Sequence, residues 1–94
     1  MLKTLEDLIK IIRGRKSSSD DSSYTAKLLK DKSLSLEKVK EEIDELIEAV
    51  ENNSNKVHEA ADVLYHLLVY LEGNGVRIED IMDELEKRKK KKES

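Results

Sequence analysis

The feature that most limits the fold of this chain is its lack of residues that interrupt a helix. Its 94 residues include no proline and only three glycines, Gly14, Gly73 and Gly75. Strands joined by tight turns depend on such residues, so hairpin signals are few along the sequence. Charged residues of both signs make up 41% of the chain, which is typical of exposed helix surfaces. We therefore predict an all-α fold with one domain over residues 1–94.

Apolar residues at helical spacing predict about five helices. We expect these helices at about residues 3–16, 23–31, 36–52, 56–72 and from 78 onward, dissolving into a basic tail at about 89–94. A loop is predicted at 17–22, and Ser22 or Ser23 is the candidate N-cap of the second helix. Connections are predicted at 31–35 and 52–55. The third and fourth helices should then pack as an antiparallel hairpin.

The two central helices are rich in apolar residues. One face of the third helix is predicted to be core, formed by Leu36, Val39, Ile43, Leu46, Ile47 and Val50. The fourth helix is apolar around most of its circumference, which is typical of a helix buried on most sides. A chain of this length buries only roughly 60 to 65% of its surface, and it has no cysteine for a disulfide. We therefore expect a homodimer in which the central pair forms a helical bundle with the same pair of a second subunit.

Three polar residues interrupt the apolar fourth helix. Glu59, Asp62 and His66 stand at i, i+3 and i+7, on one stripe of that helix. Buried carboxylates are unfavourable unless a cation compensates them. Antiparallel docking would add Glu42 and Glu45 from the third helix. Such an all-oxygen set suits Mg²⁺, with Mn²⁺ as a substitute, and predicts a polyphosphate substrate.

The spacing of these acids resembles that of a known group of enzymes. Glu41-Glu42-x-x-Glu45 and then Glu59-x-x-Asp62 is similar to the signature of the MazG-type helical pyrophosphohydrolases. Segments 23–29, 59–69 and 78–88 are similar to the phosphoribosyl-ATP pyrophosphohydrolase branch, and the resemblance covers about residues 5–88. Lys40 stands where members of that branch usually have glycine, and the connection at 31–35 also lacks the usual glycine. Neither departure removes an acidic residue of the family signature.

The resemblance implies a reaction and a set of site residues. The reaction is hydrolysis of phosphoribosyl-ATP to phosphoribosyl-AMP and pyrophosphate, the second step of histidine biosynthesis, by a homodimer. Glu42, Glu45, Glu59 and Asp62 would bind Mg²⁺, and Glu41 would be an additional catalytic acid. His66 is interpreted as a structural group. The candidates for substrate contact, either near the serine-rich loop or in a segment similar to the family, are Arg13, Arg15, Lys16, Tyr24, Thr25 and Lys27.

Other functions stay open at this point. One alternative is a house-cleaning hydrolase that acts on other nucleoside triphosphates, and another is a catalytically silent helical dimerisation module. Nucleic-acid binding by the lysines at 89–92 is disfavoured because the net charge is −3 and no aromatic platform accompanies them. The longest apolar stretch, residues 63–71, is too short to cross a membrane. A cytoplasmic protein that acts on a small nucleotide, with no membrane partner, is therefore expected.

Overall fold

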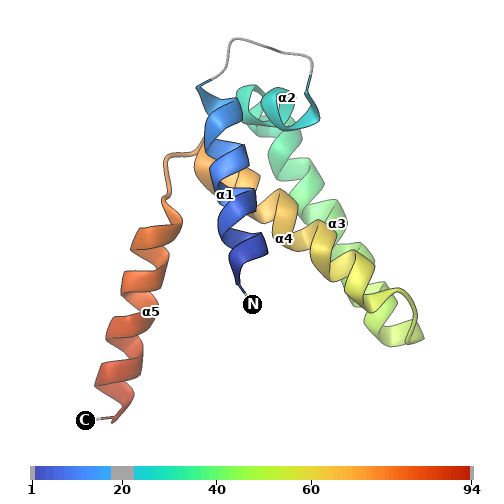
Figure 1. Ribbon diagram of the computed structural model, residues 1–94. Coiled ribbons are helices and arrows are strands. Elements are labelled where there is room, and N and C mark those ends of the chain that lie inside the picture. The colour runs from blue at the N-terminus through green and yellow to red at the C-terminus, as the bar shows by residue number, and fades with distance from the viewer. Residues whose placement is uncertain (1, 18–22, 94) are drawn as a thin grey trace.

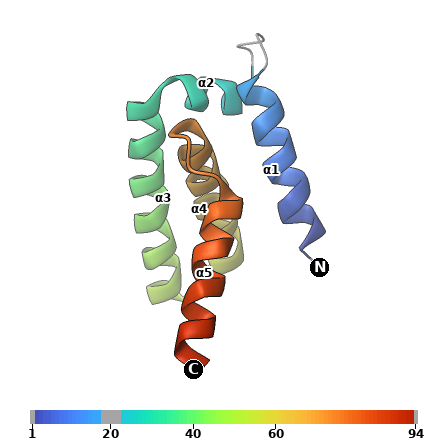
Figure 2. The same ribbon diagram turned by 90° about the vertical axis from the view of Figure 1, so that its left-hand side faces the viewer.

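The computed structural model describes residues 2–17 and 23–93, and it confirms the all-α architecture. The five helices are α1 (Lys3–Lys16), α2 (Tyr24–Lys30), α3 (Lys32–Asn52), α4 (Lys56–Gly73) and α5 (Ile78–Glu93). The predicted loop at 17–22 lies outside the described residues apart from Ser17. α3 and α4 pack side by side as the expected antiparallel hairpin, and α2 crosses one end of it (Figure 1). α5 starts beside the end of α4 and leads away from the other helices (Figure 1), and in the view of Figure 2 it lies in front of α4.

Side-chain caps set the start of α2 and of α3. Ser23 is the N-cap of α2, as predicted, because its Oγ accepts a hydrogen bond of 2.9 Å from the backbone N–H of Ala26. Asp31 caps α3 in the same way, since its Oδ1 accepts from the N–H of Leu34 at 3.0 Å. The predicted connection at 31–35 is therefore wrong. α3 begins four residues earlier than expected, and one residue joins it to α2.

The turn between α3 and α4 uses asparagines in a left-handed conformation. Asn53 has φ 53° and Asn55 has φ 56°, a region that asparagine tolerates better than most residues with a side chain. Asn53 ends α3, and its N–H bonds to the carbonyl of Val50. The two central helices thus reverse direction within residues 53–55, close to the predicted connection.

The core lies where α1, α2 and the C-terminal half of α4 meet. Ile12, Leu28 and Val69 are its largest fully buried side chains. Ile9 and Leu68 complete the buried cluster, and partly buried leucines from α1, α2 and α3 pack against it. This core holds the end of the hairpin that α2 crosses and leaves the other end to extend outward (Figure 1).

Most of the apolar face of α3 is exposed in the single chain, contrary to prediction. Among its six residues only Val39 is buried and Leu46 half-buried, whereas Ile47 is 51% exposed. The expectation that α4 is buried on most sides is also wrong for one chain, since Val57 is 85% exposed. The physical reason is that α3 packs only on α4 and α2, so its outer side meets no other helix.

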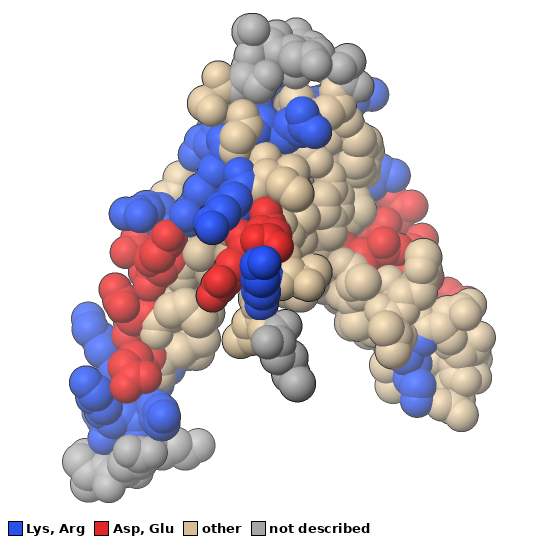
Figure 3. Space-filling model, in the orientation of Figure 1, with Lys and Arg blue, Asp and Glu red and all other residues tan. Residues whose placement is uncertain are grey.

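α5 continues through the basic residues to Glu93, whereas the sequence predicted that it dissolves into a basic tail at about 89–94. Lysine and glutamate are good helix formers, and Arg88 pairs with Glu84 one turn earlier at 3.1 Å. Basic side chains gather on the outer part of this helix (Figure 3). No helix among the described residues combines the length and apolar character that crossing a membrane requires.

Candidate functional site

Carboxylates from both helices of the hairpin converge between them. Glu42 and Glu45 lie one turn apart on α3, and Glu59 lies in the first turn of α4. One oxygen of each lies within 4.8 Å of the others. The antiparallel packing of α3 on α4 creates this group, because no single helix carries all three acids. Three of the four predicted metal ligands are therefore brought together.

The group is electrostatically costly as bare anions. The Oε2 atoms of Glu42 and Glu59 are buried and have no hydrogen-bond partner among the described residues. Burial raises the pKa of both carboxyls, and the neighbouring Glu45 raises each pKa further. A divalent cation would reverse this penalty. The oxygen-only donor set fits Mg²⁺ or Mn²⁺, and the role of these residues as metal ligands stays a prediction.

Asp62, the fourth predicted ligand, belongs to a second group that shares Glu59. The ligand atoms of His58, Glu59 and Asp62 also lie within 4.8 Å of one another. His58 Nε2 is 3.4 Å from Oδ2 of Asp62, one turn along α4. Sequence reasoning missed His58, although its i, i+4 spacing to Asp62 placed it beside the acidic stripe.

Glu41 lies outside both groups. Its exposed carboxylate pairs at 3.3 Å with Lys38, which stands one turn before Glu42 on α3. The hydrogen bond to Glu41 raises the pKa of Lys38. Burial raises the pKa of the Tyr24 hydroxyl, while the charge of Lys38 acts in the opposite direction. Lys38 is thus a cation beside the candidate site that sequence reasoning missed, because its spacing does not distinguish it from other surface lysines.

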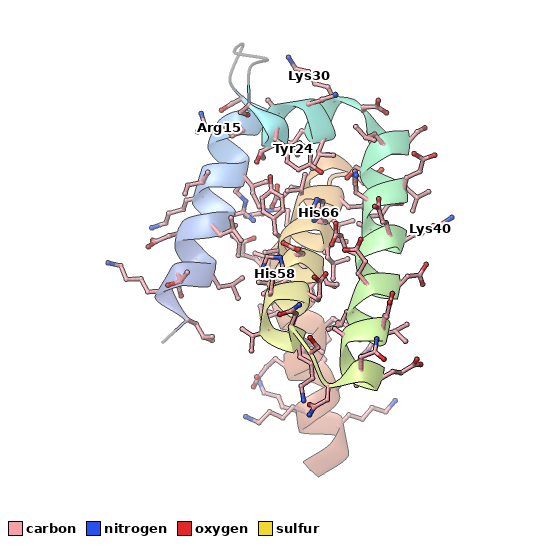
Figure 4. The ribbon with its side chains drawn as sticks, turned by 90° about the vertical axis from the view of Figure 1, so that its right-hand side faces the viewer. Arg15, Tyr24, Lys30, Lys40, His58 and His66 are labelled. Carbon is pink, nitrogen blue, oxygen red and sulfur yellow. The ribbon has the colours of Figure 1, made fainter. Side chains whose placement is uncertain are left out.

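Tyr24 and His66 tie α2 to α4 beside the carboxylates. Nδ1 of His66 is 2.8 Å from the backbone carbonyl of Asp62, so this nitrogen donates. Nε2 then accepts a hydrogen bond of 3.0 Å from the Tyr24 hydroxyl. Tyr24 points from α2 toward His66 (Figure 4). The hydroxyl of Thr25 pairs with that of Tyr65 next to this bond. These contacts agree with the interpretation of His66 as a structural group.

Two of the basic residues predicted to contact substrate are engaged elsewhere. Arg13 bonds to Glu72 and Glu79, and Lys16 donates a hydrogen bond of 2.8 Å to the carbonyl oxygen of Glu72. Both side chains therefore join α1 to the junction of α4 and α5.

The other two basic candidates, Arg15 and Lys27, have exposed side chains. Lys27 lines an open hollow at the junction of α2 and α3, together with Lys30, Asp31, Lys32 and Ser33. Figure 4 shows Arg15 near the end of α1, on the side away from α3. The substrate-contact role of all six candidates stays a prediction.

A cavity of about 220 Å³ opens beside the carboxylates at the turn of the hairpin. Glu45 and Glu59 form one side of it, so a ligand in the cavity would lie against the candidate metal position. The remaining lining is mostly polar and consists of Glu48, Ala49, Asn52, Ser54 and Asn55.

Comparisons with known proteins identify the relatives of this chain. The family model described as phosphoribosyl-ATP pyrophosphohydrolase matches residues 5–89. A phosphoribosyl-ATP pyrophosphatase of Methylobacterium nodulans is 47% identical over 88 residues, which cover 90% of this chain and 82% of that protein. A phosphoribosyl-ATP pyrophosphatase of Ruegeria pomeroyi is 46% identical over 90 residues, which cover 93% of this chain and 86% of that protein.

A longer relative is also similar. The histidine biosynthesis bifunctional protein of Thermotoga maritima is 41% identical over 87 residues, which are 89% of this chain and 44% of that protein. No solved structure matches the chain significantly. The family match spans both acidic motifs, all of α2, α3 and α4, and most of α1 and α5. This chain therefore belongs to the phosphoribosyl-ATP pyrophosphohydrolase family.

Proposed function

We propose that this chain hydrolyses phosphoribosyl-ATP to phosphoribosyl-AMP and pyrophosphate, the second step of histidine biosynthesis. The observation that carries the proposal is the convergence of Glu42, Glu45 and Glu59 from two helices, with Asp62 beside Glu59. The names of relatives up to 47% identical over most of the chain support the choice of substrate. The proposal keeps the cytoplasmic location expected from the sequence.

The four carboxylates would hold Mg²⁺, whose charge would compensate the unpartnered oxygens of Glu42 and Glu59. When bound, Mg²⁺ supplies positive charge to the phosphate oxygens and to the departing pyrophosphate. In the reaction, the oxygen of a water molecule forms a new bond to phosphorus and the phosphoanhydride bond breaks. Glu42 and Glu45 on α3 and Glu59 and Asp62 on α4 would hold the cation, and the bound cation would supply the positive charge that orients the phosphate chain.

Residues around the carboxylates would complete the site. Lys38 places an ammonium group one turn from Glu42, where it would bind phosphate oxygens that the cation does not reach. His66 accepts a hydrogen bond from the Tyr24 hydroxyl and donates one to the backbone carbonyl of Asp62. It would thereby hold α2 in place beside Asp62. The six predicted substrate contacts remain part of the proposal, with Arg13 and Lys16 acting through the position of α1.

Pyrophosphate release from phosphoribosyl-ATP tests the proposal directly. The assay should include a panel of ordinary nucleoside triphosphates, with and without Mg²⁺, for the wild type, Glu59→Gln and the exposed control Glu51→Gln. We expect Mg²⁺-dependent release from phosphoribosyl-ATP that Glu59→Gln abolishes and Glu51→Gln retains. Preference for free triphosphates would favour a house-cleaning hydrolase, and no release from any substrate would favour a silent helical module.

We also propose that two copies form a homodimer through the hairpin. Apolar residues that one chain leaves exposed, such as Ile43, Ile47 and Val50, lie on α3, and Val57 and Leu64 lie on α4. An exposed apolar surface of this kind favours association. Uncharged residues dominate the outer end of the hairpin on the face shown in Figure 3. A second hairpin packed there would build the expected helical bundle.

A further inference from the structure

We propose that His58 is a nitrogen ligand of a second, outer divalent-cation position, which consists of His58, Glu59 and Asp62. This inference rests on the metal site of the proposed function and extends it. The inner position, formed by Glu42, Glu45 and Glu59, has oxygen donors only. The outer position would therefore accept a metal with affinity for nitrogen, such as Mn²⁺ or Zn²⁺, better than Mg²⁺.

The geometry of α4 brings the three ligands of the outer position together. His58 Nε2 lies 3.4 Å from Oδ2 of Asp62, and one oxygen of Glu59 lies within 4.8 Å of both ligand atoms. Asp62 follows His58 by four residues and Glu59 by three, so all three side chains share one side of the helix. A simple surface ion pair would need only His58 and Asp62. Glu59 reaches the same point, so a cation there would have a third ligand atom.

Glu59 connects the outer position to the inner one. It contributes a ligand atom to both groups, and its Oε2 is buried without a hydrogen-bond partner in the described part of the chain. A carboxylate with two oxygens can bridge two cations, which in two-metal hydrolytic sites lie about 3.5–4 Å apart.

His58 is the histidine that is available for this role. Both ring nitrogens of His66 are already hydrogen-bonded, to the carbonyl of Asp62 and to the Tyr24 hydroxyl, and the residue is buried. The side chain of His58 is 73% exposed. Its imidazole can thus rotate to bind an ion without breaking a core contact, and solvent can deliver the ion to it.

Pulsed electron paramagnetic resonance of bound Mn²⁺ tests this inference. The full chain is loaded with Mn²⁺ in a buffer free of imidazole and amines, and coupling to ¹⁴N of an imidazole is recorded. We expect this coupling in the wild type and in the control Lys56→Gln, which changes an exposed residue two positions earlier. Coupling should disappear in His58→Gln, while Mn²⁺ still binds at the inner position.

Calorimetric titration gives a second readout. In His58→Gln the Kd for Zn²⁺ should rise at least about tenfold, and the Kd for Mg²⁺ should stay within about twofold of the wild type. Mn²⁺ bound without nitrogen coupling, or an unchanged Kd for Zn²⁺, would overturn the outer position and leave the Mg²⁺ site standing. A wild-type chain that binds neither Mn²⁺ nor Mg²⁺ would overturn the metal site of the proposed function as well.

Discussion

Nε of Arg13 donates a hydrogen bond of 2.9 Å to Oε1 of Glu72, which fixes the last turn of α1 to the last turn of α4. The side chain of Glu72 is only 9% exposed, and its other ion pair, with Lys16, is long at 3.9 Å. Arg13→Gln would leave this carboxylate poorly compensated. We expect the free energy of unfolding to fall by about 1–3 kcal/mol, less than for a fully buried pair because solvent reaches Arg13. Urea denaturation measures this change.

Arg15→Gln is the matched control for that experiment. Arg15 lies on the same turn of α1, and its side chain is exposed. Its replacement should change the free energy of unfolding by no more than about 0.5 kcal/mol. Equal losses for the two variants would show that the contact with Glu72 contributes little to the docking of α1.

Glu79 makes stability depend on acid pH. Its hydrogen bonds with Arg13 lower its pKa from an ordinary value of 4.5 to about 2. Between these values the unfolded chain binds more protons than the folded chain, so this contribution to stability is present above pH 4.5 and disappears as the pH falls toward 2. Glu79→Gln should therefore be less stable than the wild type at pH 7, and the difference should vanish near pH 2.

Thermal unfolding across that pH range tests the prediction, with Asp80→Asn as the control. Asp80 lies in the same first turn of α5, so its replacement reproduces the loss of a negative charge near the helix start. A pH-dependent difference of equal size for both variants would assign the effect to the helix dipole instead of Arg13.

The helices and the acids of the candidate site could be predicted from the sequence because both depend on local spacing. Apolar periodicity located α1 and α4 closely, and the i, i+3 pairs identified Glu42, Glu45, Glu59 and Asp62. The start of α3 was missed because Asp31 caps the helix by accepting a hydrogen bond from the N–H of Leu34. The apolar periodicity gives no sign of this bond. Periodicity also showed which face of α3 is apolar, but it could not show that one chain lacks the helix to cover it.

The contacts of individual side chains were harder to foresee. Lys38 and His58 are ordinary polar residues in the sequence, and only the packing of α2, α3 and α4 gives them neighbours. Arg13 and Lys16 are basic residues near a loop, which suggested phosphate contacts. The structure shows that both bond to the distant Glu72, and a separation of more than fifty residues leaves no signal in a single sequence.

Glu59→Gln should uncouple stability from Mg²⁺. In the absence of divalent ions the variant should be at least as stable as the wild type, because a neutral amide replaces a carboxylate with a buried, unpaired oxygen. Wild-type stability should rise by about 1.4 kcal/mol for each tenfold increase of free Mg²⁺ above its Kd. Thermal denaturation over a series of Mg²⁺ concentrations, with Glu51→Gln as the control, checks both statements. A variant that Mg²⁺ stabilises as strongly as the wild type would exclude Glu59 as a ligand.

Tyr24→Phe should loosen the attachment of α2 to α4. It removes the donor to Nε2 of the buried His66 in a partly buried hydrogen bond, so we expect a loss of about 1 kcal/mol in urea denaturation. In the wild type, ¹⁵N shifts of His66 should show the tautomer with the proton on Nδ1. Tyr70→Phe is the control, since it removes a tyrosine hydroxyl on α4 that takes no part in the bond between Tyr24 and His66. A tautomer with the proton on Nε2 would contradict the assigned direction of the hydrogen bond.

Ile47→Glu should convert the proposed dimer to monomers. Ile47 is 51% exposed on the uncovered face of α3, and a glutamate there would have to lose its water when a second hairpin packs on it. Ile11→Glu changes a residue with a similar exposure of 53% on α1, away from the hairpin. Sedimentation equilibrium should give twice the chain mass of 10.8 kDa for the wild type and for Ile11→Glu, and a single chain mass for Ile47→Glu. Dissociation caused by Ile11→Glu alone would move the interface from α3 to α1, and a wild type that is monomeric would mean that the apolar hairpin face serves another partner.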